Sequence, residues 1–71
     1  MPFVRVDLRH GRSPEQIREL HRRLAEVVAE VVNAPIGSVR TYITEFPHSA
    51  WGIGGVVQDG GAGRGEEFNH A

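Results

Sequence analysis

Pro2 follows the initiator Met1 directly and is the residue of this chain best suited to proton transfer. A small second residue normally permits removal of the initiator methionine, so we expect Pro2 to become the N-terminus with a free secondary amine. Such an amine can take up a proton and return it. The chain has no Cys and no Lys, which excludes thiolate attack and lysine Schiff-base chemistry. On position alone, an ordinary strand start is the simpler interpretation of Pro2.

Composition narrows the remaining chemistry. The four histidines, His10, His21, His48 and His70, lie in different segments without metal-ligand spacing, so we expect no metal site. Eight arginines against nine acidic residues leave a net charge of -1, which argues against a nucleic-acid or membrane-surface binder. No apolar run approaches the roughly 20 residues that span a bilayer, and no signal peptide is evident. Zero cysteine is compatible with the cytoplasm, where we expect the protein.

A helix is predicted from Pro14 to about Val32. Ser13 as N-cap and Gln16 three residues later form a capping box, and Pro14 is tolerated because its missing N–H would lack a partner there anyway. Asn33 suits a left-handed cap. The apolar residues of this segment recur with a period near 3.6 and are Ile17, Leu20, Leu24, Val27, Val28 and Val31.

Strands are predicted on both sides of this helix, over residues 3–8 and 39–46, because apolar residues alternate there with period two. The order strand, helix, strand indicates a β-α-β unit with parallel strands and a right-handed crossover. Residues 51–57 are apolar but interrupted by glycine, which predicts a short hairpin or arm. We assign the α+β class and a domain over residues 1–57, followed by a Gly-rich tail over 58–71 that we expect to be disordered.

One helix on a two-stranded sheet leaves much apolar surface uncovered. A lone unit of this size is marginal, and without cysteine no disulfide can support it. Trp51, in the predicted arm, has little within its own subunit to pack against. We therefore expect an obligate oligomer in which sheets and arms of neighbouring chains complete each other.

Residues 1–55 contain a series of short motifs in a fixed order. They are Met1-Pro2, Gly11-Arg12-Ser13, Ala34-Pro35, Ser38-Val39-Arg40, Ile43-Thr44-Glu45 and Trp51-Gly52-Ile53-Gly54-Gly55. In this combination and spacing the chain resembles the 4-oxalocrotonate tautomerase family. The resemblance implies a β-α-β subunit, a dimer with a four-stranded sheet, and a homohexamer built as a trimer of dimers.

The resemblance also implies a cofactor-independent isomerase in which Pro2 is the general base and then the general acid. The type reaction ketonises 2-hydroxymuconate, a 2-hydroxydienoate dicarboxylate, to its 2-oxo isomer. An amine accepts a proton only when neutral, and a dry, apolar pocket with arginines nearby lowers the pKa of an amine. Trp51, at a position where the family usually has Phe, is then the apolar wall, and its indole N–H adds a donor that Phe lacks.

Arg12 matches the family arginine that holds the remote carboxylate of the substrate. Arg40 matches the one that engages the 1-carboxylate and the 2-oxygen from a different subunit, so it is also a candidate to stabilise charge developing on that oxygen. A guanidinium binds a carboxylate bidentately and stays charged, which suits both tasks. Without the resemblance, both arginines would be interpreted as solvated loop and strand residues.

Arg9 introduces an alternative. In the trans-3-chloroacrylic acid dehalogenase branch, arginines at the positions of Arg9 and Arg12 both bind the substrate carboxylate, and an acid after the aromatic wall activates water. Ile53 stands at that acid's position and cannot activate water, so this reaction is disfavoured. Arg9 then either rims the pocket or is solvated. Two further settings stay open: a subunit of a biosynthetic pathway, and a subunit of a heterohexamer with a different or no catalytic activity.

Overall fold

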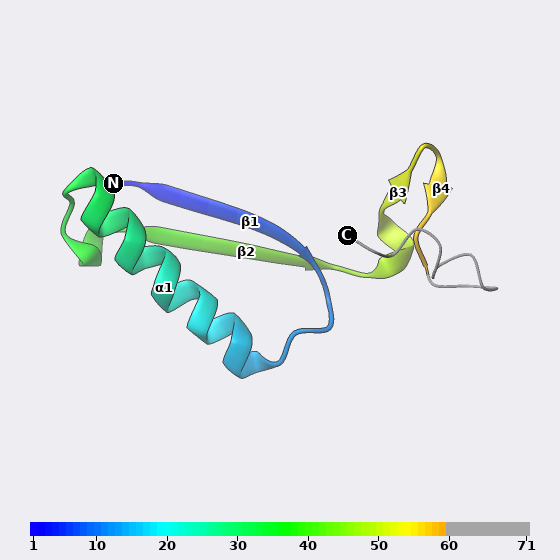
Figure 1. Cartoon of the computed structure of the whole chain (residues 1–71), viewed down its shortest axis with the longest axis horizontal. Coiled ribbons are helices and arrows are strands. Elements are labelled where there is room, and N and C mark those ends of the chain that lie inside the picture. The colour runs from blue at the N-terminus through cyan, green and yellow to red at the C-terminus, as the bar shows by residue number, and fades with distance from the viewer. Residues whose placement is uncertain (60–71) are drawn as a thin grey trace.

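Two parallel strands and one helix form the body of the molecule in the computed structural model, which describes residues 1–59. Strands β1 (Phe3–Arg9) and β2 (Arg40–Phe46) pair in parallel along their whole length. Helix α1 (Pro14–Val32) connects them and lies along one face of the sheet (Figure 1). The predicted α+β class and β-α-β unit are confirmed. Residues 60–71, most of the predicted tail, lie outside the described residues.

Capping residues determine where α1 begins and ends. The Ser13 hydroxyl accepts a hydrogen bond from the Gln16 N–H at 3.1 Å, and the Gln16 amide oxygen accepts one from the Ser13 N–H at 2.9 Å. Asn33 closes the other end in the left-handed region, with φ 59°, and its N–H donates to the Ala29 carbonyl. Both predicted caps are confirmed.

Strand boundaries differ by one residue from those expected. β1 extends to Arg9 because Arg9 still pairs with Phe46. β2 starts at Arg40 and not at residue 39, because the short 3₁₀ helix η1 (Ile36–Ser38) uses the Val39 N–H, which donates to the Ile36 carbonyl at 3.1 Å. The turn η1 therefore delivers the chain directly to the start of β2.

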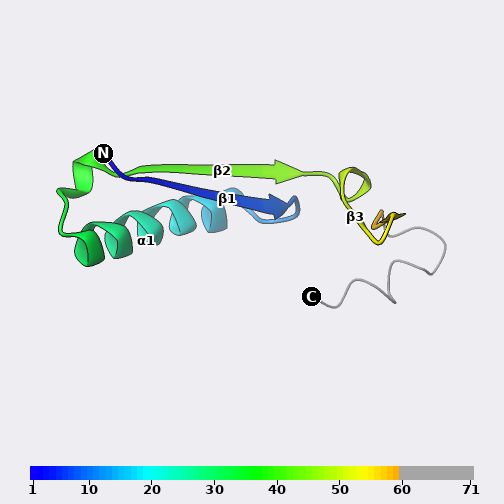
Figure 2. The same cartoon turned by 90° about the horizontal axis from the view of Figure 1, so that it is seen from above.

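A small hairpin follows the body of the molecule. The 3₁₀ helix η2 (His48–Ala50) leads into β3 (Gly52–Ile53), which pairs antiparallel with β4 (Val56–Val57). Gly54 and Gly55 form the turn with φ of 57° and 85°, a region that favours glycine. The predicted hairpin is thus confirmed, and it lies beyond the end of β2, away from α1 (Figures 1 and 2).

One face of the β1–β2 sheet is covered by α1 and the other is open (Figure 2). Val4 and Val6 on the helix side are half-buried, whereas Phe3 and Tyr42 on the open side are 72% and 58% exposed. No apolar side chain of residues 1–59 is fully buried. Burial of apolar surface is the main favourable term in folding, and the single chain leaves much of this surface exposed.

The apolar stripe of α1 is also wider than the sheet that it covers. Val31, which the helical period assigns to the stripe, is 75% exposed, and Val27 beside it is exposed as well. A sheet of only two strands cannot reach the flank of a helix on which these valines lie. Within residues 1–59, no helix has the length and apolarity that a membrane span needs.

Candidate active site

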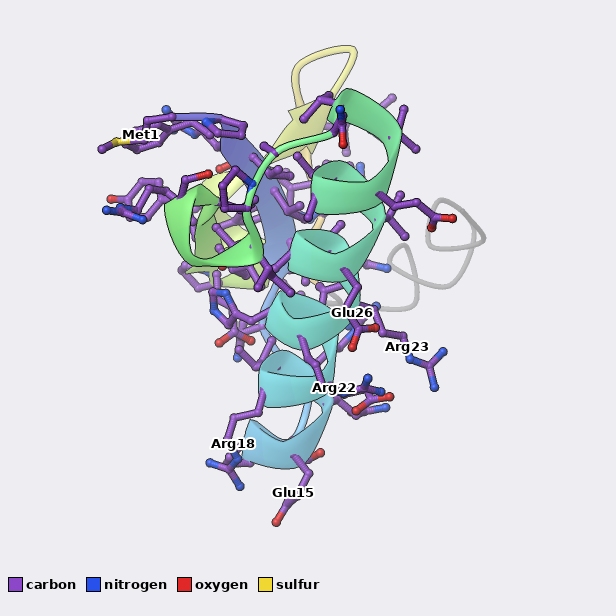
Figure 3. All side chains as sticks on the ribbon, turned by 90° about the vertical axis from the view of Figure 1, so that its left-hand side faces the viewer. Met1, Glu15, Arg18, Arg22, Arg23 and Glu26 are labelled. Atoms are coloured by element: carbon purple, nitrogen blue, oxygen red, sulfur yellow. The ribbon has the colours of Figure 1, made fainter. Side chains whose placement is uncertain are left out.

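Pro2 lies immediately before β1, at the N-terminal end of the sheet, and is half-buried. Its carbonyl oxygen accepts a hydrogen bond from the Arg40 N–H at 2.9 Å. This bond extends the parallel ladder by one residue and holds Pro2 beside the start of β2. Met1 is exposed and points away from the body of the molecule (Figure 3). Removal of Met1 would therefore leave the sheet unchanged.

Arg40 is placed next to Pro2 by the register of the strands, in which Phe3 lies opposite Arg40. Alternate residues of a strand face the same side, so Arg40 shares the open face of the sheet with Tyr42. Its exposed guanidinium donates from Nη1 to the Gly37 carbonyl at 3.0 Å. A bond to a neutral carbonyl leaves the positive charge of the guanidinium for an anionic ligand.

Arg9 and Trp51 meet at the opposite, C-terminal end of the sheet. The guanidinium carbon of Arg9 lies 5.2 Å from the centroid of the half-buried indole, a cation–π contact. The ring of Phe46, the last residue of β2, meets the indole edge-on with centroids 6.3 Å apart. The Arg9 guanidinium therefore lies over the face of the Trp51 indole within one chain.

The loop between β1 and α1 brings Arg12 to this same end of the sheet. The His10 N–H donates to the Phe46 carbonyl at 2.8 Å, and the imidazole rings of His10 and His48 lie 5.1 Å apart. Gly11 turns the chain with φ 127°, and Arg12 follows it, exposed. Sequence reasoning missed this pair of histidines, because they are far apart in the chain and only the closure of two loops brings them together.

The predicted site residues thus fall into two groups within one chain. Pro2 and Arg40 form an N-terminal group, whereas Arg9, Arg12 and Trp51 form a C-terminal group at the far end of β1. The seven residues of β1 span about 23 Å at about 3.3 Å each. A small dicarboxylate cannot touch both groups of one chain at once.

A cluster of charged residues on α1 lies away from both groups. The Glu19 carboxylate accepts hydrogen bonds of 2.6 Å from Arg22 and 2.6 Å from Arg23, which lower the pKa of Glu19; the same contact with Glu19 raises the pKa of Arg22. Both arginines point outward from α1 (Figure 3). An open hollow beside them contains no predicted site residue and is therefore not a candidate active site. It is lined by Glu15, Gln16, Glu19, Leu20 and Arg23.

Comparison with known proteins agrees with this architecture. The family model described as "Tautomerase enzyme" matches residues 2–59. The 2-hydroxymuconate tautomerase of Stutzerimonas stutzeri is 42% identical over 55 residues, which cover 78% of this chain and 87% of that protein.

Solved structures show the same similarity. The heterohexamer 4-oxalocrotonate tautomerase from Chloroflexus aurantiacus J-10-fl superposes with a TM-score of 0.75 at 37% identity, covering 80% of this chain and 92% of that one. TomN, a 4-oxalocrotonate tautomerase homologue in the tomaymycin biosynthetic pathway, gives a TM-score of 0.77 at 28% identity and covers 99% of this chain and 97% of its own. With the family model spanning almost all described residues, the chain belongs to the 4-oxalocrotonate tautomerase family of the tautomerase superfamily and is an isomerase.

Proposed function

We propose that this protein is a cofactor-independent tautomerase that ketonises a 2-hydroxydienoate acid such as 2-hydroxymuconate, with Pro2 as general base and then general acid. The observation that carries the proposal is the fixed place of Pro2, whose carbonyl is bonded to the Arg40 N–H before β1 begins. The similarity to a 2-hydroxymuconate tautomerase supports the substrate class.

The reaction moves one proton. The amine of Pro2 takes the proton from the 2-hydroxyl group of the dienol, the electron pair of that O–H bond forms the 2-oxo group, and the conjugated double bonds shift. The resulting ammonium returns the proton to carbon, so nothing is oxidised or reduced. An amide nitrogen cannot act in this way because its lone pair is delocalised into the carbonyl. Activity therefore requires removal of Met1.

The arginines of the two groups bind the two ends of the substrate. Arg40, contributed by a different subunit from Pro2 as the family resemblance implies, engages the carboxylate next to the reacting oxygen and stabilises the negative charge that develops there. Arg12 holds the remote carboxylate through a bidentate contact. Trp51 forms the aromatic wall between them, and Arg9, which lies on the indole, rims the pocket on the side of the remote carboxylate.

Each active site is formed by more than one chain, because Pro2 and Arg12 of one chain are too far apart for a small substrate. Antiparallel pairing of two β1 edges in a dimer with a four-stranded sheet places the C-terminal end of one chain beside the N-terminal end of the other. The exposed Phe3 and Tyr42 of the open face supply apolar surface on which three such dimers associate into a hexamer.

A second candidate is the same proline chemistry on a different acid in a biosynthetic pathway. The likeness to TomN, with a TM-score of 0.77 at 28% identity, supports it. A third candidate is a chain that acts within a heterohexamer, with a different or no activity of its own. The Chloroflexus aurantiacus protein, which this chain resembles, is a heterohexamer.

The test is the rate of 2-hydroxymuconate ketonisation, followed by its ultraviolet change, on protein shown by intact mass to lack Met1. The oligomeric state of the same sample is measured by light scattering. Fast turnover by a homohexamer supports the first proposal, and a preparation that retains Met1 serves as the inactive control. No turnover by a Met1-free homohexamer rejects this substrate, and failure to assemble without a second polypeptide favours the heterohexamer.

A further inference from the structure

Gln58 is the only fully buried residue in the described part of the chain, with 3% of its surface exposed. It follows β4 directly, at the base of the hairpin. Its main-chain N–H donates to the Trp51 carbonyl at 2.9 Å, and its side-chain Nε2 donates to the Val56 carbonyl at 2.8 Å. Burying a polar side chain is costly unless its hydrogen bonds are satisfied, so the position of this amide requires an explanation.

The register of the hairpin places Gln58 beside Trp51. Gly52 lies opposite Val57, and the hydrogen bond from Gln58 to the Trp51 carbonyl extends the pairing by one step. Side chains of directly opposed residues in an antiparallel pair lie on the same face, with Cβ atoms about 4.5–5.5 Å apart. The amide of Gln58 and the indole of Trp51 are therefore neighbours.

These neighbours carry complementary polar atoms that both need a partner. The indole Nε1 of Trp51 is a donor and the side-chain Oε1 of Gln58 is an acceptor. Both atoms are buried, and neither has a hydrogen-bond partner within residues 1–59. The two atoms therefore do not bond to each other directly. A buried donor or acceptor without a partner costs more than the bond itself contributes, so one water bridging the two would satisfy both at once.

We propose that Gln58 is a positioning residue for Trp51: one bridging water accepts from the indole N–H and donates to the amide oxygen of Gln58, and this bridge orients the ring that forms the aromatic wall. The inference rests on the proposed function, in which Trp51 is that wall. The pair is matched, because a phenylalanine at position 51 has no N–H and would need no acceptor. Gln58 thereby determines how tightly the substrate is held, and it does not touch the reacting atoms.

Trp51 is the only tryptophan of the chain, so its fluorescence reports on this contact without activity. We would compare the full-length, Met1-free oligomer with Gln58→Ala and with Gln58→Met, which keeps the length of the side chain and removes its polar atoms. Val57→Ala is the matched control, because Val57 is exposed and lies on the opposite face of the same strand. The probes are acrylamide quenching of Trp51 and the kinetics of 2-hydroxymuconate ketonisation.

We expect both Gln58 variants to raise the quenching constant about twofold and to lower kcat/KM about tenfold, mainly through KM, as loss of a buried hydrogen bond does. Val57→Ala should change neither quantity. In a Trp51→Phe background, Gln58→Met should lower kcat/KM less than about twofold, since no indole N–H is left unpaired.

Unchanged quenching in both Gln58 variants would overturn the inference, and so would a full tenfold loss from Gln58→Met in the Trp51→Phe background. Increased quenching with unchanged kcat/KM would also overturn it, because Trp51 would then be held by Gln58 outside the active site. If the wild-type oligomer does not turn over 2-hydroxymuconate at all, the proposed function fails, while the quenching data still decide whether Gln58 orients Trp51.

Discussion

The two ends of the β1–β2 sheet hold their functional residues in different ways. At the N-terminal end, Pro2 and Arg40 are fixed by a main-chain hydrogen bond that extends the strand ladder. At the C-terminal end, Arg9 and Trp51 are held by ring contacts between side chains from a strand and a hairpin. Pro2 and Arg40 are thus positioned by the backbone, whereas the side chains of Arg9 and Trp51 are positioned by packing against each other and against Phe46. Substitutions at the two ends should therefore affect catalysis differently.

Pro2→Ala should have the largest effect on activity, and it should remove the function of the N-terminal group only. Alanine retains the carbonyl that bonds to the Arg40 N–H, so the fold should be preserved while the secondary amine is lost. Because general acid–base catalysis contributes about 100- to 10,000-fold, we expect kcat to fall about 1,000-fold. Ketonisation kinetics and circular dichroism of Met1-free protein check this result. A variant with more than a tenth of wild-type kcat would exclude Pro2 as the general base.

Mixed oligomers would show whether the two ends meet only across chains. Equal amounts of Pro2→Ala and Arg12→Ala chains, refolded together, should regain about one quarter of wild-type activity at low substrate. A site is intact only when its Pro2 comes from the second chain and its Arg12 from the first, each with a chance of about one half. If both residues of a site came from one chain, activity would not exceed the residual contribution of Arg12→Ala itself.

The backbone features were more predictable than the side-chain contacts. The caps at Ser13 and Asn33 and the parallel pairing of the strands follow from local residue patterns, so the body of the fold could be predicted closely. The contact of Arg9 with Trp51 and that of His10 with His48 could not, because they depend on how separate loops close. The candidate site residues could be recognised in the sequence. Their separation into two groups at opposite ends of the sheet became visible only from the strand register in the structure.

Gln58 shows the same limit at the end of the domain. Composition becomes Gly-rich and polar from this residue onward, which is why the predicted tail begins there. The structure buries Gln58 because it lies opposite Trp51 in the hairpin, and hairpin register is not visible in composition. A complete active site could not be predicted from one chain for a further reason: its proposed parts belong to different subunits.

Substitution of the two proposed carboxylate-binding arginines should sharpen the contrast further. Arg40→Ala should lower kcat and raise KM, with about a 100-fold loss of kcat/KM, because its charge acts on the transition state as well as on binding. Arg12→Ala should raise KM about tenfold with kcat nearly unchanged, because Arg12 contacts the remote carboxylate equally in the bound substrate and in the transition state. Arg18→Ala, on the exposed side of α1, is the control. If Arg12→Ala lowered kcat and Arg40→Ala changed only KM, the roles proposed for the two arginines would have to be exchanged.

The smallest effect should come from a third region, the outward side of α1, which belongs to neither end. Hydrogen bonds from Arg22 and Arg23 lower the pKa of Glu19, so its ionised form stabilises the folded chain. This contribution is complete above the ordinary glutamate pKa of 4.5 and is lost as the pH falls through the lower pKa of the folded state. Glu19→Gln should therefore lower the Tm at pH 7 by at most about 2 °C, since the pair is exposed and screened. The difference in Tm between the variant and the wild type should shrink below pH 4.5, as thermal melts at several pH values would show, while kcat/KM stays unchanged. If Glu19→Gln lost activity at pH 7 without a change in oligomeric state, the hollow beside Glu19 would take part in catalysis. The proposal that the active site consists only of the groups at the two ends of the sheet would then be wrong.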